Sequence, residues 1–334
     1  MRDVVVMVAL VVGCIHFSAC GAGVNAESDS ALDVPVDMHR GASPIAIHRP
    51  LKAGMRLHVQ GVMRKHRRIT GVANGVVVNQ QTNHLQLSYD LNKTLLDVDA
   101  SGNVKRVRYQ VGFVESTDAE APPFAALSQG QVARLQGASA AQTSSSSGQI
   151  FDFERVGDQP KVAMVSGTLT PVERVALTDP FGPGYELWFE GELAQLFGPK
   201  EPQREGGEWD IDVERARQLL VLAGELSPPM TISGKATFVG LEKVGDVKVQ
   251  RVEAWVKGEG GLHIEEQRKI HANINRVEVK YVGLFPLDAS LPPVEHDWQF
   301  KAKGHVVMEI SDVLGDLQFE SRLEHQSRIL EVHR

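Results

Sequence analysis

Acidic residues at alternate positions are the first feature of the sequence that could do chemistry. Asp97, Asp99 and Ser101 precede Gly102 with the spacing that opens an EF-hand calcium loop, in which carboxylates bind the ion and glycine makes the sharp bend. The twelfth position of such a loop needs a bidentate glutamate, and here it is Arg108. The flanking residues alternate as strands do, so we predict a plain hairpin turn and no calcium site.

The histidines could instead bind a transition metal. Neighbouring strands could bring His271, His305 and His325 together as the three imidazoles of a zinc site. However, the sequence has no HExxH motif and no histidine pair at metal-ligand spacing. We therefore interpret these histidines as packed side chains and predict neither a metal nor another cofactor.

Nucleophilic catalysis lacks its usual landmarks. There is no GxSxG elbow and no SxxK motif, and both cysteines, Cys14 and Cys20, lie near the N-terminus. Surface or helix-capping roles are the simpler interpretation of the carboxylates that could form an acid–base pair, which are Glu186, Glu190, Asp210, Asp212 and Glu214. We predict that the protein is not an enzyme, with an unrecognised hydrolase as an alternative.

A run of five basic residues stands in an otherwise acidic chain. Each such charge contributes roughly 1 kcal/mol near an anionic membrane, so the run could contact lipid phosphates or an acidic partner. The candidate contact residues are Arg64, Lys65, Arg67 and Arg68, with His66 among them. The alternative interpretation is a solvated loop between Val59 and Val76.

The tryptophans allow two interpretations. They could line a groove for a glycan or a lipid, or they could belong to a core. The four residues are Trp188, Trp209, Trp255 and Trp298.

The N-terminal segment predicts export. Val4–Val12 is an uninterrupted apolar stretch of signal-peptide length. Phe17–Cys20 resembles the lipobox of bacterial lipoproteins, which implies a signal peptide over residues 1–20, lipidation at Cys20 and a membrane anchor. By the same resemblance, Gly21 after the cysteine favours the outer membrane. Cleavage after Ala26 is the alternative and would leave a secreted or periplasmic protein.

Composition excludes several classes of protein. The 334 residues are 42% hydrophobic, and 35 Lys and Arg against 42 Asp and Glu give a net charge of −7. The apolar content rules out disorder of the whole chain, and the negative charge argues against nucleic acid as a partner. Beyond the N-terminus, no apolar stretch approaches the length needed to span a bilayer as a helix.

The elements that would position these residues are mainly strands. Met55, Leu57 and Val59 alternate with polar neighbours, and residues 85–91 and 107–113 show the same period of two. The longest alternating segments come after residue 230, over Met230–Val244, Asp246–Lys257, His263–Tyr281, Asp297–Ile310 and Gly315–Val332. Such alternation is typical of antiparallel strands with one packed face and one wet face.

Two slips of phase and one helix complete the pattern. The alternation slips at Gln250–Arg251 and again between Ile274 and Val277, which predicts β-bulges there. A helix is predicted around 213–225, capped by Asp212. The fold class is therefore mainly β, or α+β at most, with long curved antiparallel sheets that form a half-open barrel or clamp and one covering helix.

The predicted organisation has five parts. A signal peptide with a lipobox spans residues 1–20 and a flexible tether 21–50. An N-terminal β module spans 51–115, an Ala/Ser/Gln-rich linker or insertion 116–148, and a C-terminal antiparallel module with a short helix 149–334.

A resemblance covers the C-terminal part. Gly207–Ile211, followed by a helix and then Ile232–Phe238, is similar to lipoprotein-like, β-rich proteins of the bacterial envelope that carry no assigned activity. We predict a non-enzymatic, envelope-anchored binding or scaffold module whose protein, glycan or lipid partner is open. The alternatives are a carrier that holds an apolar ligand such as a lipid in a curved sheet, and the hydrolase named above.

Overall fold

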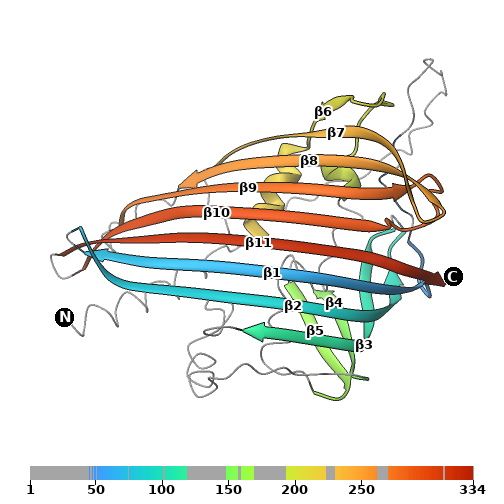
Figure 1. The fold of residues 1–334 in the computed structure, drawn as a ribbon, viewed down its shortest axis with the longest axis horizontal. Helices are drawn as coiled ribbons and strands as arrows, with labels where there is room; N and C mark the ends of the chain where they lie inside the picture. Colours follow the sequence, from blue (N-terminus) through green and yellow to red (C-terminus); the bar gives the residue numbers. More distant parts are fainter. Residues whose placement is uncertain are drawn as a thin grey trace.

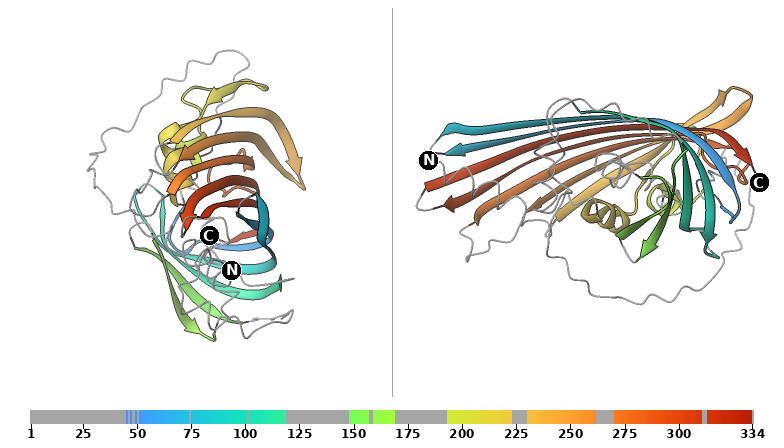
Figure 2. Two further views of the ribbon diagram at one scale, coloured as in Figure 1. Left: turned by 90° about the vertical axis from the view of Figure 1, so that its left-hand side faces the viewer. Right: turned by 90° about the horizontal axis from the view of Figure 1, so that it is seen from below.

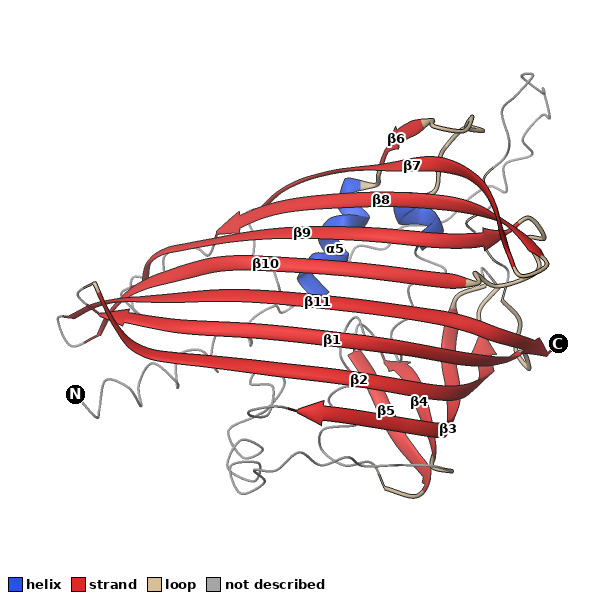
Figure 3. Cartoon of the chain, in the orientation of Figure 1, coloured by secondary structure: helices blue, strands red, loops and turns tan. Residues whose placement is uncertain are grey.

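Long antiparallel strands make up most of the chain in the computed structural model (Figures 1 and 3). The structure describes residues 45, 47, 49, 51–73, 75–100, 102–118, 148–156, 159–168, 193–222, 230–261, 270–310 and 313–333. The strands are β1 (Arg56–Ala73), β2 (Val76–Val98), β3 (Val104–Asp118), β4 (Ile150–Val156), β5 (Gln159–Ser166), β6 (Glu208–Asp210), β7 (Met230–Val244), β8 (Val247–Gly261), β9 (Ile270–Pro286), β10 (Glu295–Ile310) and β11 (Val313–His333). The helix α5 spans Val213–Leu222.

The described strands form one sheet of eleven, in the order β5-β4-β3-β2-β1-β11-β10-β9-β8-β7-β6. Every neighbouring pair is antiparallel. Among the described strands, the first, β1, pairs with the last, β11, from Arg56 opposite His333 to Ala73 opposite Gly315, with one register shift between His58 and Val59. Strands of the two predicted modules therefore belong to a single sheet, and the predicted mainly β, antiparallel fold class is confirmed.

The sheet is curved, and its two edge strands lie far apart (Figure 2). We call the face covered by α5 the inner face and the opposite one the outer face. On β11 the alternation predicted from the sequence is confirmed, because Leu323, His325 and Ser327 are buried on the inner face while the residues between them are not.

The core occupies the inner face toward the ends of β1 and β11 that carry Arg56 and His333. We call this part of the sheet the proximal half, and the part beyond Met63 on β1 the distal half. In the proximal half, Leu57, Val59 and Met63 of β1 are at most 1% exposed. They pack with buried side chains from strands on both sides of the β1–β11 pair, among them Leu87, Tyr109, Phe151 and Phe300.

The predicted helix is present. Its start is fixed by Asp212, whose carboxylate accepts a hydrogen bond from the Arg215 amide at 3.0 Å, as an N-cap does. Ala216 and Leu220 are fully buried. The capping role predicted for Asp212 is therefore confirmed.

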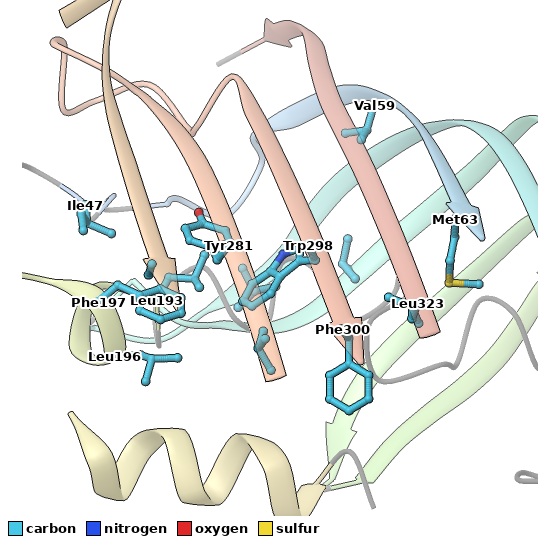
Figure 4. Close-up of a cluster of buried hydrophobic side chains, with 14 of the residues drawn as sticks. Ile47, Val59, Met63, Leu193, Leu196, Phe197, Tyr281, Trp298, Phe300 and Leu323 are labelled. Carbon is cyan, nitrogen blue, oxygen red and sulfur yellow. The ribbon is translucent and has the colours of Figure 1, made fainter. Parts of the chain in front are cut away.

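A second helical segment, residues 193–197, was not predicted. It places Leu193, Leu196 and Phe197 against the inner face (Figure 4), where the Phe197 ring stacks on Tyr281 with centroids 5.0 Å apart. The segment is too short to show a helical period, which explains why the sequence pattern does not reveal it. Around Tyr281 the inner face is filled by these side chains.

The two predicted bulges are wrong in position. Pairing of β8 with β9 continues without a shift through Gln250 and Arg251, and the register shift lies across the ladder in β7, between Phe238 and Gly240. Pairing of β9 also runs regularly from Ile274 to Val277. A slip of hydrophobic phase therefore marks the neighbourhood of an irregularity without saying which strand carries the extra residue.

Candidate anionic-surface site

The basic run lies inside a strand. β1 continues without interruption from Arg56 to Ala73 and pairs with β2 on one side and β11 on the other throughout the run. The solvated-loop interpretation between Val59 and Val76 is therefore wrong. The alternation of apolar and polar residues fails to reveal this stretch because neither face of the distal half carries the usual apolar pattern.

Strand geometry divides the run between two faces. Successive side chains of a strand point to opposite sides, so Arg64, His66 and Arg68 belong to the outer face, and Lys65 and Arg67 to the inner face. Arg64 and Arg68 are exposed, whereas Lys65 and Arg67 are partly covered. The sequence candidates therefore form two pairs rather than one patch.

The hairpin ends in exposed valines. Gly75 makes the turn with φ of +77°, a conformation that suits glycine, and the next three residues are Val76, Val77 and Val78, exposed by 64%, 57% and 49%. Val77 lies opposite Val72, and Val76 lies opposite Ala73. Consecutive valines on both faces of a hairpin tip are unlike the one-sided pattern of a strand that packs on a core.

Charge is one-sided in this part of the chain. The segment from Arg64 to His84 contains four permanent cations and no aspartate or glutamate, in a protein whose net charge is −7. We call this segment, which is the distal part of the β1–β2 hairpin, the distal hairpin. Its cations and its exposed valines are the two groups that an anionic lipid surface attracts.

Two histidines face each other across the distal hairpin. His66 and His84 are directly opposite in the register, and their ring centroids are 4.3 Å apart. The pKa of His66 lies below its usual value because its ring is partly desolvated and because His84 and Arg68 repel a proton, while Glu320 acts in the opposite direction. His66 therefore adds little charge at neutral pH and more as the solution is acidified.

Several sequence candidates lie outside the described residues. These are the proposed lipidation site Cys20, the alternative cleavage site Ala26, Trp188, Glu186 and Glu190.

The calcium-like loop is built as a hairpin turn. Asp99 accepts hydrogen bonds from the Asn103 amide at 2.9 Å and from its side chain at 3.2 Å, and it pairs with Lys105 at 3.3 Å. Its carboxylate thus closes the connection between β2 and β3, as the hairpin interpretation predicts.

The three late histidines do not share one face. The alternation along β10 and β11 puts His305 on the outer face and His325 on the inner face. His325 is 1% exposed and is hydrogen-bonded through Nε2 to the Tyr89 hydroxyl at 2.8 Å, which is the packed role expected of it. Among the described residues, no group of three or more His, Cys, Asp or Glu side chains could hold a metal ion.

The described tryptophans do not line a common groove. Trp298 is buried on the inner face against Tyr281, with centroids 4.5 Å apart, and Trp209 donates its ring N–H to the Phe197 carbonyl at 2.8 Å. The residues before and after Trp255 on β8 are buried on the inner face, whereas Trp255 is 38% exposed on the outer face. The Lys257 ammonium lies 5.5 Å from its ring centroid.

Two contributors to the site are missed by sequence reasoning: the valine tip and His84. Asn74-Gly75 is the strongest short-range hairpin signal, and together with the adjoining valines it could have revealed the turn. Nothing in the local sequence pairs His66 with His84, because the register of two long strands decides that contact.

Comparison with known proteins gives only distant likenesses. No family model matches the sequence, and a search of curated proteins finds no match. A structure of lipovitellin, solved to describe lipid–protein interactions, is similar over 85% of this chain with 8% identity and a TM-score of 0.32, and this chain spans only 26% of that one. What the site does must follow from its own residues.

Two bacterial outer-membrane proteins are also similar. An outer membrane channel from Pseudomonas putida F1 has a TM-score of 0.19 and 8% identity, with 89% of this chain and 100% of that chain covered. A mutant of the Rh. blastica porin has a TM-score of 0.19 and 8% identity, with 80% and 99% covered. Among the described residues of this protein, no helix has the length and apolar character needed to cross a membrane.

Proposed function

We propose that this protein is a non-enzymatic binding module of the bacterial envelope that docks on an anionic lipid surface through its distal hairpin. One observation carries the proposal: the distal hairpin has four permanent cations, no carboxylate and three exposed valines at its tip. Around Tyr281 the inner face is filled by side chains of residues 193–197, so we propose docking in preference to carriage of an apolar ligand.

The cations and the valines of the site supply different parts of the binding free energy. Exposed cations lower the free energy of the protein near anionic headgroups by roughly 1 kcal/mol each. The valines add the hydrophobic contribution of side chains that leave water for the interface. From Arg68 to Val72 the strand rises about 13 Å, so cations and valines reach the headgroup and acyl regions together.

An anchor at Cys20 would make this contact a second attachment. We infer export and acylation at Cys20 from the lipobox, with the tether over residues 21–50 joining the anchor to the sheet. A fatty-acid probe fed to cells should label the wild-type protein and leave a Cys20→Ala variant unlabelled. Equal labelling of the variant would refute acylation at this residue.

The docking is tested with the full-length chain carrying Cys20→Ala, so that no acyl chain contributes. The protein should co-sediment with vesicles of phosphatidylcholine and phosphatidylglycerol, and only weakly with phosphatidylcholine alone. Arg64→Gln with Arg68→Gln removes two exposed cations and should lower the partition coefficient about 30-fold. Val76→Ser with Val77→Ser should lower it about tenfold, because two exposed apolar side chains are lost.

The matched control removes two cations elsewhere. Lys243→Gln with Lys248→Gln changes exposed lysines at the proximal end of β7 and β8, and it should leave the partition coefficient nearly unchanged. Equal binding to the two kinds of vesicle, or equal losses in the control and the arginine variant, would overturn the proposal. Unfolding curves of each variant establish that the fold is retained.

A further inference from the structure

We infer that the membrane-facing surface extends from the distal hairpin into a basic band that crosses the outer face of seven strands, so that the sheet lies along the lipid by that face. The inference rests on the proposed function and deepens it, because it states which face meets the membrane and how far the contact reaches. The strands concerned are β2, β1, β11, β10, β9, β8 and β7.

The band consists of three rows of residues that are neighbours in the register. Each row contains three exposed cations from different strands. The first row holds Arg64, Lys280 and Lys235, the second Arg322, Lys301 and Lys257, and the third Arg68, Lys303 and Arg276. His66 and His84 lie in the second row.

Carboxylates in the same rows are fewer. They are Glu324, Glu278, Glu320 and Glu259, so nine cations face four carboxylates and the band has an excess of five positive charges. The short edge strand β6 continues the first row with Asp210 opposite Lys235, and the excess is then four. This surplus stands against a net charge of −7 for the whole chain.

The band has clear limits along the strands. The next outer row toward the core has no cation and two carboxylates, Asp297 and Glu253. The next row toward the tip, which includes Thr70, Gln318 and His305, has no permanent charge. Within the seven strands, a row without a permanent cation therefore borders the band on each side. Beyond the row toward the core, Arg328 and Arg251 lie on the outer face in one row with Glu295.

Some of the cations are held by neighbours. Lys303 pairs with Glu320 at 3.0 Å, and Arg276 pairs with Glu259 at 3.0 Å. Arg322 also pairs with Glu324, and Lys235 pairs with Glu208 of β6 at 3.4 Å, so four of the nine cations have a carboxylate partner. Exposed pairs of this kind contribute little to stability. The excess of cations over carboxylates in the band is what interacts with headgroups.

The size of the band suits contact with an extended surface. Six gaps between seven strands span about 29 Å, and three rows span about 13 Å along the strands. The described helices lie on the inner side of the sheet, and the outer side is not covered by them (Figure 2). An array of charges of this size matches an extended lipid surface better than it matches a single small anion.

Trp255 is an independent indication of the same orientation. It lies in the first row between Lys235 and Lys280, with the Lys257 ammonium over its ring, and it is 38% exposed in a row whose other members on the seven strands are all polar or charged. Tryptophan is enriched at membrane–water interfaces, where its apolar body and polar N–H are both accommodated. The structure thus places an interfacial aromatic within the band, in the row nearest the core.

The test uses cations of β9 and β10, which lie outside the distal hairpin. In the vesicle assay above, Lys280→Gln with Lys301→Gln should lower partition into phosphatidylglycerol-containing vesicles about 30-fold, as much as the loss of Arg64 and Arg68. Lys243→Gln with Lys248→Gln again serves as the control of equal charge. Brominated phosphatidylglycerol should quench a part of the tryptophan emission that is absent in Trp255→Phe.

The outcomes separate the two proposals. If Arg64→Gln with Arg68→Gln weakens binding while Lys280→Gln with Lys301→Gln does not, the distal hairpin docks alone and the band is refuted. Quenching that is the same in wild type and Trp255→Phe would also refute it. If the Cys20→Ala chain without further substitutions binds neither kind of vesicle, the proposed function itself fails.

Discussion

The proximal and distal halves of β1 are one strand with two different surroundings. In the proximal half, Leu57, Val59 and Met63 point to the inner face and are buried to 1% exposure or less. In the distal half the same face carries Lys65, Arg67 and Ile69, which are only partly covered. The pairing with β2 and β11 continues through both halves.

Backbone pairing alone therefore does not create a core. Both halves pair with neighbouring strands, but in the described part of the chain the fully buried apolar side chains of β1 lie in the proximal half. The distal half keeps its strand conformation although Lys65 and Arg67 occupy inner-face positions there and are only partly covered. This looser burial of the β1 side chains distinguishes the distal half, which we propose as the docking region.

Two glycines on the same face of β1 give the largest expected effect. A Cβ atom at Gly61 would overlap the ring and hydroxyl of Tyr89, which crosses this glycine to reach His325, whereas a Cβ at Gly71 would make contacts no closer than 3.7 Å. Gly61→Ala should lower the free energy of unfolding by about 2–3 kcal/mol, through overpacking and a broken buried hydrogen bond. Urea denaturation measures the change.

Gly71→Ala is the matched variant and should change the free energy of unfolding by less than about 0.5 kcal/mol. Similar losses in both variants would mean that the distal half is as tightly packed as the proximal half. Tyr89→Phe separates the two causes at Gly61, because it removes only the hydroxyl. That variant should cost about 1 kcal/mol.

Acidification should have a smaller effect, which lowers the free energy of unfolding and strengthens docking. Because the pKa of His66 in the folded protein lies below its usual value, its contribution to stability is complete above pH 6.5 and is lost as the pH falls through that lowered pKa. The added charge should strengthen binding to phosphatidylglycerol vesicles about fivefold. Unfolding and partition measured between pH 7.5 and 5 test both signs.

His66→Gln should reduce both pH dependences. His333→Gln is the control, since His333 is exposed at the proximal end of β11 beside Glu331. A pH dependence of docking that survives in His66→Gln would assign the effect to other groups, His84 first among them.

The strands that pack on one face are the part of the fold that the sequence predicts well. Leu317 to Ile329 alternates cleanly because one side of β11 is buried, and Asp212 followed by a helical stripe predicts α5. The distal hairpin is missed because Lys65 and Arg67 occupy inner-face positions of β1 and interrupt its hydrophobic period. The segment 193–197 is missed because one short turn shows no period either.

The order of residues along the chain determined the mainly β class, the alternation of faces and the concentration of positive charge at residues 64–68. Only the tertiary structure decided that these cations divide between two faces, that His66 meets His84, and that lysines of β7–β10 continue the row begun by Arg64. The physical reason is that strand periodicity is a local property of the backbone. Which strands become neighbours, and in what register, depends on contacts between residues hundreds of positions apart.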